Sequence, residues 1–145
     1  MWKRTLSTVY DIDSSLKANY ARHMMDISKQ MTKALHDKGC KLVVWTDMNF
    51  VGVFPGISAL REIELLVEAG LSPLDALKAA TSNAAECLNK QDTFGSIAPG
   101  MRADLLLLEH NPPEDIRNIY STAGVMVRGL WIDRRQIDRM FSELE

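Results

Sequence analysis

Asp47 is the residue of this sequence best placed to do chemistry. It follows Thr46 and the short apolar run from Leu42 to Trp45. An ionised carboxylate at the end of a buried strand is costly unless it is paired with a cation or bound to a metal ion. The ends of strands are also where α/β proteins build their active sites. Asp47 is therefore a candidate catalytic residue. The alternative is a structural carboxylate that caps the following loop.

The other residue types that often bind metals are scattered along the chain. His23 and His36 lie in one predicted helix, His110 follows a predicted strand, and no His-x-His sequence occurs. We interpret each histidine as a surface or packing residue. Cys40 and Cys87 have apolar neighbours and no Cys-x-x-Cys spacing, so we expect small buried hydrophobic residues in a reduced protein.

The composition limits the partners of the chain. It has 145 residues, which is the usual size of one domain, with 46% hydrophobic and 25% charged residues. The net charge is −2 with both signs interspersed, so we expect no binding to nucleic acid. No apolar run approaches the roughly 20 residues that span a bilayer. The first ten residues do not resemble a signal peptide. We therefore expect no membrane association and a cytoplasmic location.

Strands and a long helix precede Asp47 in the predicted order. Residues 5–10 are predicted to form a short strand, and residues 41–46 form the strand that ends at Asp47. Between them, one helix ends at Gly39. Its apolar face is spaced by three or four residues and contains Leu16, Tyr20, Met24, Ile27, Met31 and Leu35. This face is predicted to pack on a sheet, and a coiled-coil seam is the alternative.

Three successive helices are predicted between residues 58 and 88. Ser58 is the expected N-cap of the first helix, and Ser72 followed by Pro73 starts the second. Asn83 and Glu86 resemble a capping pair that starts the third. The first helix is expected to turn Leu60, Ile63, Leu66 and Val67 inward and Arg61, Glu62, Glu64 and Glu68 towards water.

The last third of the sequence is predicted to be mainly β-structure. Pro99–Gly100 fits a type II turn, and residues 103–109 form a buried strand. A helical turn is expected over residues 116–120, and an antiparallel pair follows with its turn at Arg128–Gly129. Residues 133–144 complete the chain as an amphipathic helix whose inward residues are Ile137, Met140, Phe141 and Leu144.

Several of these segments together resemble the amidohydrolase superfamily, in its imidazolonepropionase-like and prolidase-like subgroup. They are Thr46–Asp47, the loop to Gly56, the stretch from Ser58 to Thr81, Asn83-Ala-Ala, residues 95–100 and Ala103-Asp104-Leu. Any one segment is weak by itself, and their common order carries the resemblance. It covers nearly the whole chain and is densest from Val43 to Val127.

The resemblance implies an α/β fold and a position within it. The chain is similar to the C-terminal third of a TIM-type (β/α)8 metal-dependent hydrolase barrel, together with part of the family's small β-sandwich. The implied division is residues 1–92 for the last barrel strands and helices, 93–132 for the C-terminal strands of the sandwich, and 133–145 for a C-terminal helix.

The resemblance also implies a reaction and a cofactor. The complete enzyme would hydrolyse a carbon–nitrogen bond in a small amide, cyclic or dipeptide-like. Asp47 matches the family's aspartate, which contacts a divalent metal ion and handles the proton of the hydrolytic water. Zinc is the expected metal of the complete enzyme.

The histidine ligands of the family cannot be placed in this sequence. A catalytic zinc ion needs about three protein ligands, so Asp47 alone cannot hold one. Trp45 and Leu60 also stand where relatives commonly have glycine and histidine. We expect the isolated chain to be inactive, to bind no metal by itself, and to self-associate or join a complementary N-terminal chain. The alternative is a non-catalytic fragment or interaction subunit.

Overall fold

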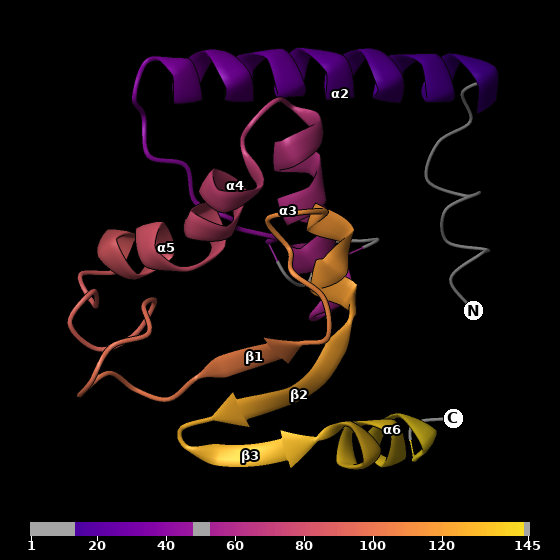
Figure 1. Cartoon of the computed structure of the whole chain (residues 1–145). Helices are drawn as coiled ribbons and strands as arrows, with labels where there is room; N and C mark the ends of the chain where they lie inside the picture. Colours follow the sequence, from indigo (N-terminus) through magenta and orange to yellow (C-terminus); the bar gives the residue numbers. More distant parts are fainter. Residues whose placement is uncertain (1–13, 48–52, 144–145) are drawn as a thin grey trace.

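The computed structural model describes residues 14–47 and 53–143, with side chains from residue 18 onward. Figure 1 shows the long helix α2 along one side, the shorter helices α3–α5 beside it, and a small sheet on the opposite side with α6 next to it. The elements are α2 (Ser14–Asp37), α3 (Ile57–Glu68), α4 (Pro73–Ala80), α5 (Ser82–Cys87), β1 (Leu105–Leu108), the 3₁₀ helix η1 (Ile116–Tyr120), β2 (Thr122–Val127), β3 (Leu130–Asp133) and α6 (Arg134–Ser142).

Helix α2 confirms the predicted long helix but not the predicted packing of its apolar face. It ends before Gly39, whose φ of 81° is the left-handed conformation expected after a helix C-terminus. The described stripe residues are exposed by between 36% at Ile27 and 67% at Tyr20. No described strand lies under this face, so the prediction that it packs on a sheet is wrong for this chain.

The strand predicted over residues 41–46 is also absent. The segment 41–47 is not paired with any described strand, and it carries no regular secondary structure. A strand is defined by its ladder of hydrogen bonds, and the described bonds of this segment run to helices instead. The strand predicted over residues 5–10 lies outside the described residues.

Helix α4 begins as predicted, whereas α3 and α5 do not. The Ser72 hydroxyl accepts the Asp75 N–H at the start of α4, with Pro73 in the first helical position. Helix α3 begins after Gly56 without a side-chain cap, and Ser58 instead accepts the Phe54 N–H. Helix α5 also lacks a side-chain cap, because Asn83 is directed to another segment.

The hydrophobic core lies between α3, α4 and η1. Its buried members are Ile63, Ala76, Ile116 and Ile119, with Val44, Leu60, Leu66, Val67, Leu77 and Ala80 packed against them. The predicted inward face of α3 is thereby confirmed. The 3₁₀ helix matters because it brings Ile116 and Ile119, which follow β1 in the chain, onto helices that precede β1.

A network of polar contacts links α3 to η1 and to α2 beside this core. Arg61 binds both Glu64 and Glu68, and the Tyr120 hydroxyl donates a hydrogen bond to Glu64 at 3.0 Å. Glu68 also pairs with Lys29 of α2. The Glu64 side chain is only 15% exposed, so the prediction that it faces water is wrong. Burial, reinforced by the Glu64 hydrogen bond, raises the pKa of Tyr120.

The antiparallel sheet has the order β1-β2-β3 and confirms the predicted hairpin. Val127 pairs with Leu130, and the turn residues Arg128 and Gly129 have φ values of 51° and 83°. Two positive φ values are typical of a type I′ turn, which matches the twist of the strands it joins. The turn at Pro99–Gly100 is also confirmed, because Met101 N–H donates to the Ala98 carbonyl and Gly100 has a φ of 86°.

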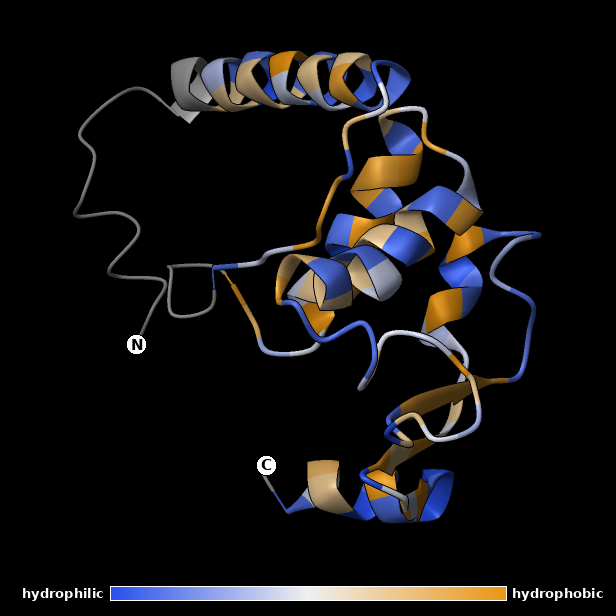
Figure 2. Ribbon diagram, turned by 90° about the vertical axis from the view of Figure 1, so that its left-hand side faces the viewer, coloured by the Kyte–Doolittle hydropathy of each residue, from blue (hydrophilic) through white to orange (hydrophobic). Residues whose placement is uncertain are grey.

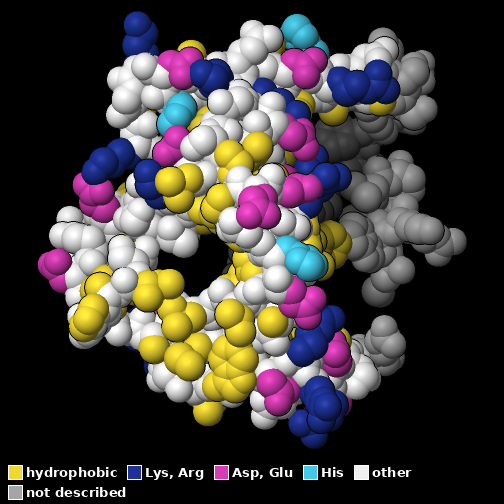
Figure 3. Space-filling model, in the orientation of Figure 1, with side chains coloured by type: hydrophobic (Ala, Val, Ile, Leu, Met, Phe, Trp, Pro, Cys, Tyr) yellow, Lys and Arg dark blue, Asp and Glu magenta, His cyan; other side chains and the backbone are white. Residues whose placement is uncertain are grey.

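Several residues predicted to be buried are exposed. Leu106 and Leu107, on opposite faces of β1, are 47% and 53% exposed, and Cys40 and Cys87 are exposed thiols. Helix α6 has the capping box of Asp133 and Gln136, but Met140 and Phe141 face outward. Leu144 lies outside the described residues. In the described part of the chain, the sheet that carries Leu106 and Leu107 has only three strands, and both side chains stay about half exposed. Figure 2 shows the hydrophobic character of β1, and Figure 3 shows hydrophobic side chains at the surface over the sheet.

Figure 3 shows hydrophobic side chains gathered over the sheet, beside an opening between the sheet and the helices. Exposed apolar area of this kind is typical of a surface that is covered by another protein segment. Among the described residues, no helix is both long enough and apolar enough to cross a lipid bilayer.

The division of the chain into a barrel part ending at residue 92, a sandwich part ending at residue 132 and a C-terminal helix stays a prediction.

We predict that Ile119→Ala destabilises the chain by about 2–5 kcal/mol, because it removes a side chain that is 2% exposed from the centre of the core. Ile97→Ala is the matched control. That side chain is 89% exposed, so its loss should change the free energy of unfolding by less than about 0.5 kcal/mol. Urea unfolding measures the change in free energy of unfolding for both variants. Equal changes would contradict the placement of Ile119 in the core.

Candidate active-site segment

Asp47 lies at the end of the extended segment 41–47 and is exposed. Its φ of 47° places the backbone in the left-handed region, which aspartate enters more readily than most residues. Together with Val44, Trp45 and Thr46 it lines a surface depression of about 370 Å³. The carboxylate is therefore open to a ligand.

Three helices hold this segment in place of neighbouring strands. Val44 N–H donates to the Ala79 carbonyl of α4 at 3.1 Å, and Trp45 N–H donates to Glu62 Oε1 of α3 at 3.1 Å. Asn83 of α5 donates its side-chain amide to the Leu42 carbonyl at 3.0 Å. Each bond pairs a backbone group of the segment that has no partner in a neighbouring described strand.

An ion pair completes the attachment at the start of the segment. Lys41 Nζ lies 2.6 Å from Glu86 Oε1 of α5. Both side chains are more than half exposed, so this pair contributes little to stability by itself. The attachments thus become more buried from Lys41 towards Val44, whose side chain packs against the core.

The described residues do not form a metal centre around Asp47. Nowhere in residues 14–47 and 53–143 do three His, Cys, Asp or Glu side chains group as metal ligands. A catalytic zinc ion takes three protein ligands and an open position, so the donor set present here does not fit the metal that the sequence predicts.

The matched family model is that of the amidohydrolase family, and the match extends over residues 18–132. This is most of the chain, and it includes both the segment ending in Asp47 and the sheet. The chain belongs to the amidohydrolase family. Its α/β structure agrees with that assignment.

Relatives of known name support the subgroup. This amidohydrolase chain is 38% identical over 100 residues to an imidazolonepropionase of Deinococcus deserti, a match covering 68% of this chain and 24% of the relative. In structure it is similar to a Xaa-Pro dipeptidase, with 30% identity and a TM-score of 0.65 over 72% of this chain and 25% of the other. The likeness to bottromycin amidohydrolase has a TM-score of 0.80, with 27% identity, and covers 98% of this chain and 31% of the other.

The chain therefore spans 24% to 31% of the length of these relatives. The imidazolonepropionase-like and prolidase-like resemblance that the sequence predicts is confirmed. The role of Asp47 stays a prediction, since similarity over the fold does not test a single side chain.

Sequence patterns failed to identify two residues that position the amidohydrolase segment. Glu62 was expected to face water and Asn83 to cap α5, yet both bind the backbone of residues 42–45. No local pattern marks either residue for this task, because the partner of each lies roughly 20 to 40 residues away in the chain.

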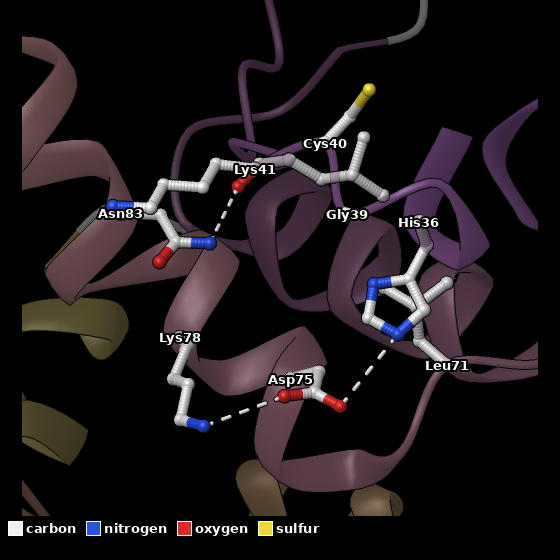
Figure 4. Close-up of a pocket in the computed structure, with 9 residues that line it drawn as sticks. His36, Gly39, Cys40, Lys41, Leu71, Asp75, Lys78 and Asn83 are labelled. Carbon is white, nitrogen blue, oxygen red and sulfur yellow. Dashed lines mark hydrogen bonds and ion pairs between the residues drawn. The ribbon is translucent and has the colours of Figure 1, made fainter.

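A second pocket, of about 200 Å³, lies on the opposite end of the segment (Figure 4). His36 Nε2 is 3.7 Å from Asp75 Oδ2, and Lys78 Nζ is 3.4 Å from Asp75 Oδ1. Hydrogen bonding from the Ser72 hydroxyl lowers the pKa of Asp75, with a smaller contribution from Lys78, while burial opposes the shift. These contacts join the end of α2 to the start of α4. His36 is thus a packing residue in this structure, as predicted.

We predict that Asp75 makes the chain sensitive to acid. A carboxyl group whose pKa is lower in the folded state stabilises the fold above its ordinary pKa of 3.8, and that contribution is lost as the pH falls through the folded value. Asp75→Asn should therefore flatten the loss of stability below about pH 4. The free energy of unfolding in urea, measured at several pH values, tests this.

The matched control is Asp92→Asn, at an exposed carboxylate, which should keep the acid slope of the native chain. The account of Asp75 is contradicted if Asp75→Asn and the native chain lose stability in parallel as the pH is lowered.

Proposed function

We propose that this chain supplies one part of an amidohydrolase that cleaves a carbon–nitrogen bond in a small amide. Asp47 is the residue that takes part in the chemistry. A carboxylate can accept a proton from the attacking water and pass it to the leaving amine. The observation that carries the proposal is the exposed Asp47 at the end of a helix-anchored segment within the region matched by the family.

The position of Asp47 supports this role. A general base must be held accurately, and residues 42–45 are bonded to three helices, two of which, α3 and α4, form the core. The left-handed backbone at Asp47 adds to this support, because such conformations persist where the surrounding structure fixes them. The carboxylate also borders the depression described above, so a small molecule can reach it.

The remaining catalytic groups must come from outside the described residues. We propose that they belong to the rest of an amidohydrolase fold, carried either on the same polypeptide or on a complementary N-terminal chain. The shares of relatives covered, 24% to 31%, leave room for such a part. A divalent metal ion, with zinc the first candidate, would be held mainly by that part.

A non-catalytic role is the second candidate, and the exposed apolar surfaces favour it. Leu130 is 69% exposed and Met31 is 60% exposed, on the sheet and on α2 respectively. Apolar side chains in such numbers on the surface promote binding to another chain or self-association. In this role the amidohydrolase fold would be retained as an interaction subunit, and Asp47 would be a structural carboxylate.

The test is to combine this chain with the part of bottromycin amidohydrolase outside the matched region, as a chimera or a two-chain mixture. A cyclic amide and an Xaa-Pro dipeptide would be the probes, with released amine or ring opening as the measurement. We expect hydrolysis by the combination and none by this chain alone. Asp47→Asn should reduce turnover by on the order of a hundredfold or more, because it removes the proton acceptor.

Asp92→Asn is the control for charge and should leave turnover unchanged, since Asp92 is exposed and lies beyond α5. Full activity of the Asp47→Asn combination would refute the role of Asp47. A folded combination that binds metal but hydrolyses neither probe would favour the interaction subunit.

A further inference from the structure

The hydrogen bond between Glu62 and the Trp45 backbone is the last described attachment before Asp47. Glu62 Oε1 accepts the Trp45 N–H at 3.1 Å, two residues from the carboxylate. The Ala79 and Asn83 bonds act on Val44 and Leu42, earlier in the segment. The direction of the chain at Asp47 therefore depends more closely on Glu62 than on the other attachments.

Glu62 differs from the other acidic residues of α3. Glu64 and Glu68 are engaged by cationic side chains or by the Tyr120 hydroxyl. Glu62 is half-buried and turns to a backbone N–H on a separate segment. A carboxylate that accepts a backbone N–H forms a charge-assisted bond, which is stronger than a bond between neutral groups.

The part of α3 that carries Glu62 is packed in the core. Its neighbour Ile63 is 6% exposed and belongs to the core, so the backbone of α3 at this point cannot move independently. Val44, adjacent to Trp45, packs against the same core. A bond from a helix packed in the core to a segment packed against the same core limits the motion of the two residues that follow.

We propose that Glu62 is a positioning residue for Asp47, holding the Trp45 backbone so that the Asp47 carboxylate keeps one orientation. The inference rests on the proposed function of Asp47 for its catalytic consequence, but the positioning itself is a property of the folded chain. Glu62→Gln should keep the Asp47 orientation nearly as well, because the amide carbonyl oxygen can accept the same N–H. Glu62→Ala should lose this orientation, because alanine has no acceptor in its side chain.

The first measurement needs no activity. In the native chain we expect slow amide hydrogen exchange at Trp45 and a high ¹⁵N order parameter at Asp47, near the value of about 0.85 for a rigid backbone. Glu62→Ala should speed Trp45 exchange by about tenfold and lower the Asp47 order parameter. Glu62→Gln should resemble the native chain.

Two controls separate positioning from loss of fold. The Val44 amide is held by Ala79, so its exchange should be unchanged in Glu62→Ala. Glu86→Ala removes a carboxylate that pairs with Lys41 at the far end of the segment, and it should leave both Trp45 and Asp47 unaffected. Equal acceleration at Val44 and Trp45, or no change at either, would overturn the proposal.

The catalytic consequence is measured in the combined enzyme described above. Glu62→Ala should lower kcat on the order of tenfold to a hundredfold with little change in KM, because it disturbs the orientation of a reacting group and not the binding of substrate. Glu62→Gln should restore kcat. Unchanged kcat in Glu62→Ala would also overturn the proposal. If the combination with native residues is inactive, the proposed function fails, and the exchange and order-parameter results still decide whether Glu62 positions Asp47.

Discussion

Among the described residues, the backbone of residues 41–47 has no neighbouring strand to pair with, and its hydrogen bonds to helices decide where it lies. Helices α3, α4 and α5 each provide one bond, from Glu62, Ala79 and Asn83. These bonds pair backbone groups that no described strand pairs, and they fix where the segment lies on the helices. The position of Asp47 depends on these three hydrogen bonds. Helices α3 and α4 also form the core with η1, and Val44 of the segment packs against it, so the candidate site and the core depend on one another.

Local signals in the sequence predicted the elements well. The Ser72–Pro73 start of α4, the hairpin at Arg128–Gly129 and the inward face of α3 each depend on residues close together in the chain, and each is confirmed. Family resemblance, which depends on the order of several segments, is confirmed as well. The Ser72 cap and the hairpin turn act over a few residues, which is why they can be predicted without the tertiary structure, whereas the caps predicted at Ser58 and Asn83 failed because both side chains have other partners.

Predictions that needed a distant partner were less successful. The strand over residues 41–46 requires a neighbouring strand, the stripe on α2 requires a sheet, and burial of Leu106 and Leu107 requires covering layers. None is present among the described residues. Glu62 and Asn83 were misjudged for the same reason, because their partners are far away in the sequence. An apolar pattern records which face was selected for burial, but it does not say which segment covers that face.

Metal content is the most direct test of the claim that Asp47 belongs to a site shared with another part of an amidohydrolase. The measurement is bound zinc per chain, after dialysis, for this chain alone and for its combination with the unmatched part of bottromycin amidohydrolase. We expect no stoichiometric zinc on the chain alone, and we expect zinc on the combination, bound more weakly when Asp47→Asn is introduced. Stoichiometric zinc on the isolated chain, or a combination whose zinc is unaffected by Asp47→Asn, would contradict it.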